Sequence, residues 1–179
     1  MTLGRRAFLG MGAAALCGAA GLEAARAAAP AAQPLVLRNL HTGEDLEVAG
    51  RRADGYEPAV LARIDLLLRD HRTGAVHPID PALMDYLGAV AALCGAAPVF
   101  GVISGYRSPQ TNASLRQHSR GVAARSLHMD GRAIDVRLEG VACATLAEHA
   151  LKLTRGGVGY YRASDFVHLD TGVFRTWRG

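Results

Sequence analysis

The stretch Ser126-Leu-His128-Met-Asp-Gly131-Arg-Ala133-Ile-Asp135 combines a serine, a histidine and an aspartate at short spacings. Ser126 and His128 are two residues apart, as are Ala133 and Asp135, so each pair is predicted to share one face of an extended segment. Between them, Met-Asp-Gly-Arg is typical of a tight turn in which Gly131 takes a positive φ. We therefore expect an imidazole and a carboxylate to meet on adjacent strands, with the small Ala133 leaving room between them. Zinc accepts both groups as ligands.

A second histidine, in a strand-like segment, completes the predicted ligand set. Asp165-Phe-Val-His168-Leu-Asp170 has the composition of a β-strand and places His168 within it. His128, Asp135 and His168 would form a three-ligand zinc site with one open position, as in catalytic zinc sites. Asp165, three residues before the last ligand, is a candidate general base beside that position. Asp170 shares the face of His168 and is a candidate to orient it.

These residues form a pattern, Ser-x-His-x-x-Gly-x-Ala-x-Asp followed by an acidic residue-x-x-His, that resembles the zinc peptidases of the D-Ala-D-Ala carboxypeptidase (M15) class. Further segments narrow the resemblance to the murein endopeptidase K family, once catalogued as a domain of unknown function. They are Ser104-Gly-Tyr-Arg107-Ser-Pro-Gln-Thr-Asn112, Gly156-Gly-Val-Gly-Tyr-Tyr161 and Phe166-Val-His168-Leu-Asp-Thr-Gly172. The resemblance covers about residues 35–177.

The resemblance implies an M15, or Hedgehog-like, peptidase fold. This is an α+β domain in which a small antiparallel sheet carries a Zn²⁺ ion and helices pack against the sheet. Arg107 is the expected catalytic residue beside the zinc, because M15 relatives use this arginine there, and an arginine at a strand exit suits a carboxylate or a developing oxyanion. Ser126 and Tyr106 are the expected substrate-binding residues.

Position 165 departs from the pattern of many M15 exopeptidases, which have a glutamate there. The phage endolysin peptidases of the class resemble this chain in having an aspartate. Asp165 would take the proton of the attacking water and pass it to the leaving amine. Its side chain is one methylene shorter than that of glutamate, so His118 is the alternative base if Asp165 points away.

The predicted function is a zinc-dependent murein endopeptidase that hydrolyses peptide cross-links of peptidoglycan. The family resemblance favours diaminopimelate–diaminopimelate or D-Ala–diaminopimelate bridges as substrates. One alternative is a D,D-carboxypeptidase that trims D-Ala from stem peptides. The other is a zinc-bearing peptidoglycan-binding module without catalysis, against which the complete ligand set and the acidic residue at position 165 argue.

The first residues of the chain have the features of an export signal. Gly4-Arg5-Arg6-Ala7-Phe8-Leu9-Gly10 resembles the twin-arginine motif, and Ala25-Arg26-Ala27 matches a small-x-small cleavage site. The predicted domains are a twin-arginine signal peptide over 1–27, an Ala/Pro linker over 28–34 and an M15-like zinc peptidase domain over 35–179. We expect a periplasmic protein, and an uncleaved membrane anchor is the alternative.

The composition is that of a globular domain, with 179 residues, of which 50% are hydrophobic and 20% charged. All basic residues except Lys152 are arginines, and they are scattered along the chain, so the formal charge of +4 predicts no nucleic-acid partner. Cys94 and Cys143 lie in apolar helical contexts, and their pairing stays open. We expect a monomer with no stable membrane insertion after signal removal.

Hydrophobic periodicity and turn residues predict the remaining elements. They are a β-hairpin over 35–48, helices over 58–72, 81–93, 111–118 and 143–154, strands over 98–104, 134–138, 156–161 and 166–170, and an edge strand over 174–177.

Overall fold

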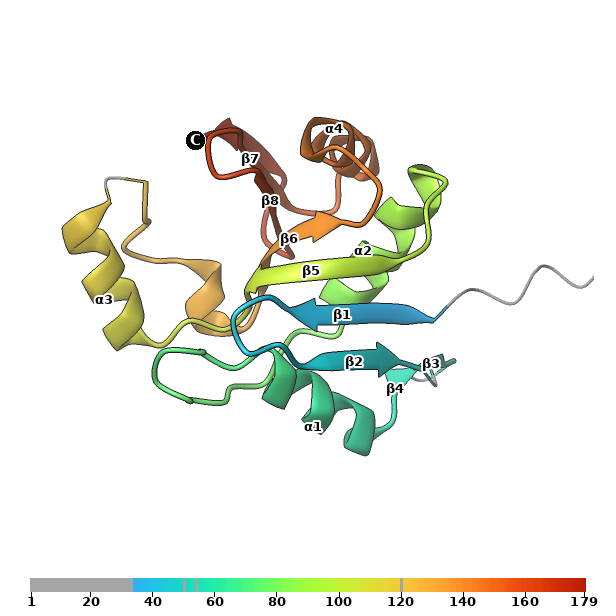
Figure 1. The fold of residues 1–179 in the computed structure, drawn as a ribbon, viewed down its shortest axis with the longest axis horizontal. Coiled ribbons are helices and arrows are strands. Elements are labelled where there is room, and N and C mark those ends of the chain that lie inside the picture. Colours follow the sequence, from blue (N-terminus) through green and yellow to red (C-terminus); the bar gives the residue numbers. More distant parts are fainter. Residues whose placement is uncertain (1–33, 50, 54, 120) are drawn as a thin grey trace, which may run out of the picture. The chain divides into compact units, whose positions relative to one another are not determined.

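The computed structural model describes residues 34–49, 51–53, 55–119 and 121–179 (Figure 1). The predicted signal peptide and nearly all of the linker lie outside the described residues. In chain order the described elements are β1 (Leu35–Asn39), β2 (Asp45–Val48), β3 (Arg51–Arg52), β4 (Gly55–Tyr56), α1 (Pro58–Leu67), α2 (Ala82–Leu93), β5 (Val99–Ser104), α3 (Pro109–His118), the 3₁₀ helix η1 (Leu127–Asp130), β6 (Ala133–Leu138), α4 (Cys143–Leu153), β7 (Gly157–Tyr161), β8 (Phe166–Asp170) and β9 (Arg175–Arg178).

The α+β prediction is confirmed, but the sheet is larger than expected and mixed. Its seven described strands run in the order β2-β1-β5-β6-β8-β7-β9. β1 is parallel to β5 because α1 and α2 lie between them in the chain and supply the crossover that parallel strands need. β9 is parallel to β7 at the sheet edge, and the other pairs are antiparallel. The expectation of a wholly antiparallel sheet was wrong, although β6 and β8, which carry two predicted ligands, do pair antiparallel.

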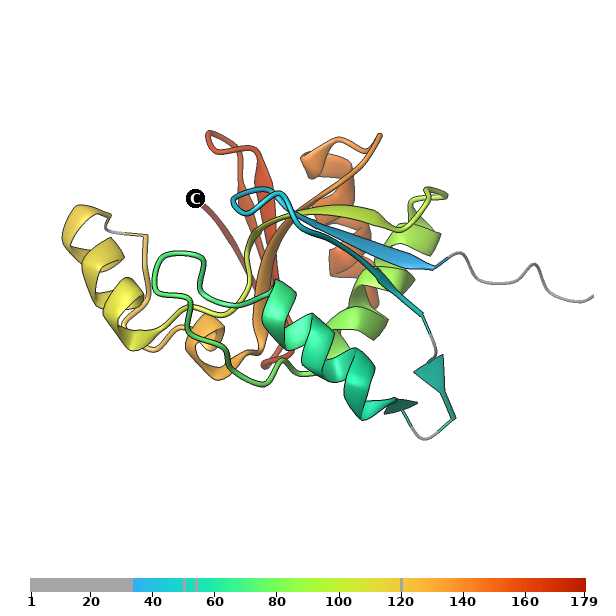
Figure 2. The ribbon, with the colours of Figure 1, turned by 60° about the horizontal axis from the view of Figure 1, so that its bottom comes forward.

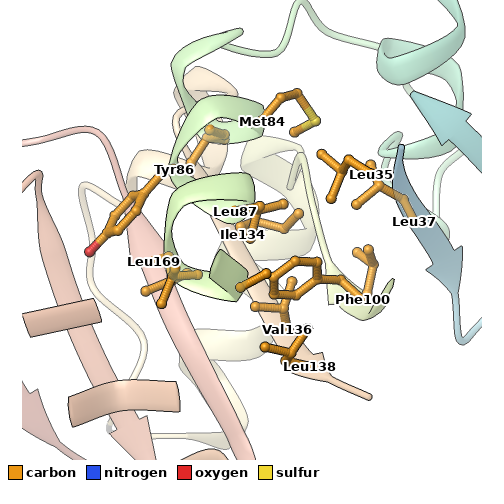
Figure 3. Packing of buried hydrophobic residues seen from close by; sticks show 14 of the residues in the cluster. Leu35, Leu37, Met84, Tyr86, Leu87, Phe100, Ile134, Val136, Leu138 and Leu169 are labelled. Carbon is orange, nitrogen blue, oxygen red and sulfur yellow. The ribbon is translucent and has the colours of Figure 1, made fainter. Parts of the chain in front are cut away.

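One hydrophobic core lies between the sheet and its helices. α2 packs against β1, β6 and α4, while α4 packs against β6, β7 and β8. Figure 3 shows Leu87 of α2 facing Ile134 and Leu169 of the sheet, with Phe100 nearby. Because side chains alternate along a strand, the other face of β6 and β8 is left for polar residues. α3 lies beside η1 and away from α2 and α4 (Figures 1 and 2).

The segment around His128 is a 3₁₀ helix, so the expected strand over Ser126 and His128 was wrong. The predicted turn at Gly131 is confirmed, with φ +64°. A Cβ at this position would overlap the carbonyl oxygen of Pro78, so the close approach of the two backbones requires glycine. The turn brings His128 back onto β6, and therefore the expected meeting of imidazole and carboxylate still occurs.

α1 ends at Leu67, earlier than the predicted helix over 58–72. The side-chain amide of Asn39 donates to the Leu67 carbonyl at 2.9 Å. Beyond the helix, the carboxylate of Asp70 accepts hydrogen bonds from the backbone N–H groups of Arg72 and Ser108, both at 2.9 Å. Burial alone would raise the pKa of Asp70, but the hydrogen bonds from Ser108, Thr111 and Arg72 hold it well below its usual value.

Asp70→Asn is expected to lower the free energy of unfolding by about 2 kcal/mol at pH 7, because the amide turns a donor toward a buried N–H group. The pKa of Asp70 is depressed in the folded state, so its contribution is complete above the unfolded pKa of about 3.9 and is lost as the pH falls below it. Urea unfolding at pH 7 and pH 3 tests this, with the difference between parent and variant shrinking at pH 3. Asp45→Asn, on the exposed hairpin, is the control and should change the midpoint little.

Among the residues that the structure describes, Cys94 and Cys143 are free thiols and do not pair with each other. Cys143 is buried at the start of α4, and burial raises the pKa of its thiol to about 11. Within the part of the chain that the structure describes, no helix combines the length and apolarity needed to cross a membrane.

Candidate metal centre

His128, Asp135 and His168 converge as predicted. β6 and β8 pair with Asp135 directly opposite His168, and η1 carries His128 to the same face. One ligand atom from each residue lies within 4.8 Å of the others, and all three residues are buried. Asp135 Oδ1 lies 2.9 Å from His168 Nδ1 and 3.2 Å from His128 Nε2. Two imidazole nitrogens and one carboxylate, gathered in this way, fit a zinc ion with an open position.

Each imidazole is held by a second hydrogen bond. His128 Nδ1 donates to the Gly105 carbonyl oxygen at 2.7 Å, which leaves Nε2 turned toward Asp135. His168 Nε2 donates to Asp170 Oδ2 at 3.1 Å, which leaves Nδ1 turned the same way. The predicted contact between Asp170 and His168 is therefore confirmed. Such bonds set the tautomer and the ring plane of metal-binding histidines.

The electrostatics of the cluster favour a cation among its carboxylates. Burial lowers the pKa of His128, which keeps this imidazole neutral and able to bind a metal. Burial acts the same way on His168, but its hydrogen bonds to Asp135 and Asp170 outweigh burial and raise its pKa to about 9. Burial would raise the pKa of both carboxyls, but His128 and His168 lower that of Asp135, and hydrogen bonds from His168, Arg175 and two backbone N–H groups lower that of Asp170.

A cavity of about 490 Å³ opens beside the cluster, and its lining includes Arg107, the predicted catalytic residue, and Ser126, a predicted substrate-binding residue. The Arg107 side chain is only 12% exposed, and its Nη2 lies 3.5 Å from Asp135 Oδ2. Among the described residues its Nε, which is also buried, has no hydrogen-bond acceptor. Burial lowers the pKa of Arg107. A buried guanidinium with an unused donor beside a cavity is suited to an anionic or polarised oxygen of a ligand.

Tyr106, the other predicted substrate-binding residue, is not among the residues that line this cavity. Its ring stacks on that of His77, with 4.8 Å between the centroids, and its N–H donates to the Leu68 carbonyl. Tyr106 and Arg107 both lie in the segment between β5 and α3, and of the two only Arg107 lines the cavity.

Asp165 also lies outside the cavity, so its prediction as general base is not supported. It occupies the turn between β7 and β8 with φ +51°, and its side chain is 67% exposed and pairs with Arg137 at 3.5 Å. Asp165 precedes the first residue of β8 and has a left-handed backbone conformation, so the alternation of the strand does not place it on the face of His168. The alternative base, His118, lies exposed at the end of α3 and bonds the Ser114 carbonyl.

Trp177 and Arg175 of β9 line the cavity, and the sequence analysis assigned neither of them a role. Their two-residue spacing on a predicted edge strand was the available signal. Tyr161 and Phe166 extend this wall, with ring centroids 4.5 Å apart. The cavity thus has an aromatic side formed by β7, β8 and β9.

Two comparisons with known proteins identify relatives of the chain. The family model described as peptidoglycan L,D-endopeptidase MepK matches residues 27–177 of the chain. Peptidoglycan L,D-endopeptidase MepK of Escherichia coli strain K12 is 43% identical over 176 residues, which cover 97% of this chain and 96% of that protein. The probable peptidoglycan L,D-endopeptidase MepK of Haemophilus influenzae is 44% identical over 151 residues, or 84% of this chain and 81% of that protein.

Proposed function

Since the chain belongs to the peptidoglycan L,D-endopeptidase MepK family, we propose that it is a zinc-dependent endopeptidase that hydrolyses peptide cross-links of peptidoglycan. The observation that carries the proposal is the convergence of His128, Asp135 and His168 on a cavity bordered by Arg107. The predicted signal over residues 1–27 makes the periplasm the proposed location.

The chain's own residues have separable tasks in this proposal. His128, Asp135 and His168 would hold a zinc ion, and the Lewis-acid chemistry it would supply when bound is the polarisation of a peptide carbonyl and a lower pKa of water. Arg107 donates hydrogen bonds from its buried guanidinium to the carbonyl oxygen as negative charge develops there. Asp170 keeps the His168 ring in place through the hydrogen bond at Nε2.

The names of the relatives favour one of the two predicted substrates. An L,D-endopeptidase cuts between an L centre and a D centre. The diaminopimelate–diaminopimelate bridge has such a bond, whereas the D-Ala–diaminopimelate bridge joins two D centres. Arg107, Arg125 and Arg175 line the cavity, and three arginines suit bridges that keep free carboxylates. We therefore propose diaminopimelate–diaminopimelate bridges as the preferred substrate.

Muropeptide analysis of purified sacculi, incubated with the protein with and without a chelator, tests the proposal. Loss of cross-linked dimers with a matching gain of monomers, blocked by chelator and restored by Zn²⁺, is the expected result. The identity of the dimers that disappear reports the bond. Free D-Ala with intact cross-links would instead identify a carboxypeptidase. An unchanged profile from zinc-loaded protein would leave a binding module.

Asp165→Asn is expected to retain activity within about 3-fold of the parent, because the exposed Asp165 carboxylate pairs with Arg137 outside the cavity. Initial rates of dimer cleavage across pH 5 to 9 provide the measurement. A general base would instead show a rate loss of about 10²-fold or more and the disappearance of the acid limb of the pH profile. That result would place Asp165 at the reaction centre after all.

A further inference from the structure

Four residues lie in one row across the sheet at the metal centre. Asp135 of β6 is opposite His168 of β8, His168 is opposite Gly159 of β7, and Gly159 is opposite Trp177 of β9. Directly paired residues project from the same face of a sheet. The row therefore places Trp177 on the face of the predicted ligands, with only a glycine between it and His168.

Gly159 leaves the space that the indole of Trp177 fills. A Cβ on Gly159 would overlap the six-membered ring and Nε1 of that indole. Because the Cβ is absent, the indole reaches across β7, and its centroid lies 5.1 Å from that of His168 with the planes tilted by 53°. The indole is also anchored at its far side, where Nε1 donates to the Tyr161 hydroxyl at 2.9 Å.

A second row, two residues away, repeats the arrangement. A Cβ on Gly157 would overlap the carboxylate of Asp170 and the guanidinium of Arg175. Across this gap Arg175 donates to both Asp170 oxygens, at 3.1 and 2.6 Å. The Arg175 guanidinium also lies 5.1 Å from the Trp177 ring centroid, which ties the two rows together.

We propose that Trp177 is a positioning residue for His168, which it reaches through the gap left by Gly159. Arg175 supports this arrangement because it reaches Asp170 through the gap left by Gly157 and fixes the carboxylate that is the hydrogen-bond partner of His168. The indole covers one side of the imidazole, limits rotation of the ring and keeps water from that side. This inference rests on the proposed function in one respect only, namely that His168 binds zinc.

The zinc affinity of the full-length protein and its variants tests the proposal, measured by competition with a chromophoric chelator. Trp177→Ala and Gly159→Ala are each expected to weaken zinc binding by about 10-fold, the lower end of the effect of residues that orient metal ligands. Trp177→Phe, which keeps an aromatic ring against His168, should have a zinc affinity within about 3-fold of that of the parent. Gly159→Ala should have no further effect in the Trp177→Ala background, because the group it displaces is gone.

Gly88→Ala on α2 is the matched control, because a Cβ there would meet no atom within 4 Å. Trp177 is the only tryptophan of the chain, so its fluorescence is a direct second readout. Co²⁺ should quench it in the parent and in Gly88→Ala, and should do so only at higher Co²⁺ concentration in Gly159→Ala.

Parental zinc affinity in Trp177→Ala would overturn the proposal, as would an equal loss in Trp177→Phe. The proposal would also be overturned if Gly159→Ala weakened zinc binding as much in the Trp177→Ala background as it does in the parent. If Gly159→Ala fails to fold, the comparison of Trp177→Ala with Trp177→Phe decides the matter by itself. Failure of the proposed function looks different, since the parent would then bind no stoichiometric zinc.

Discussion

Asp135→Asn is expected to abolish stoichiometric zinc binding and to lower the rate of cross-link cleavage by at least about 10³-fold, or about 4 kcal/mol in the activation free energy. The substitution keeps the shape of the side chain but removes the only anionic ligand of the three. It also removes the negative charge that faces the buried Arg107 guanidinium. The same charge helps to raise the pKa of His168, so that effect is lost as well. The two measurements are the zinc content of the purified protein, by elemental mass spectrometry, and the rate of dimer cleavage on sacculi.

The interpretation of this variant depends on its folding. A buried Arg107 without its counter-charge is expected to destabilise the domain by about 2–4 kcal/mol, so circular dichroism must first establish a folded protein. Asp45→Asn should keep full zinc content and activity, because Asp45 is exposed on the β1–β2 hairpin. A folded Asp135→Asn variant with parental activity would contradict the assignment of the metal centre.

The convergence of His128, Asp135 and His168 could be predicted from the sequence, because local patterns mark the elements that carry these residues. Asp135 and His168 each lie in a strand with clear alternation, and Gly131 marks a turn that only glycine allows. The prediction assumed a strand at His128, which is in a 3₁₀ helix, and the expected meeting of the two side chains occurs nonetheless. Any turn ending at Gly131 that returns the chain onto β6 brings this imidazole near Asp135.

The rest of the site depends on geometry that spacing alone does not reveal. Tyr106 and Asp165 were assigned roles from motifs, yet neither lines the cavity. The Tyr106 ring stacks on that of His77, and Asp165 lies in the β7–β8 turn beside Arg137. Trp177 was missed because its contact with His168 requires the register of three strands and the absence of a side chain at Gly159. Such pairings join residues distant in sequence, and no local pattern specifies them.

Arg107→Lys is expected to lower kcat for dimer cleavage by about 10²–10³-fold while zinc content stays at the parental level. A lysine keeps the positive charge beside Asp135, so the metal ligands are retained. It loses the planar fork of donors, including the Nε that has no acceptor among the described residues. Because these hydrogen bonds form to an oxygen that gains charge only during the reaction, KM should change by less than about 3-fold.

The pattern of the loss distinguishes this role from two others. If Arg107 bound a ground-state carboxylate, Arg107→Lys would raise KM and leave kcat near the parental value. If it only supported the fold around Asp135, the variant would lose zinc along with activity. Arg38→Lys, at an exposed position of β1 outside the cavity, is the comparison and should change both constants by less than about 3-fold. A fall in kcat confined to Arg107→Lys, in zinc-replete protein, is the result that assigns the buried guanidinium to the transition state.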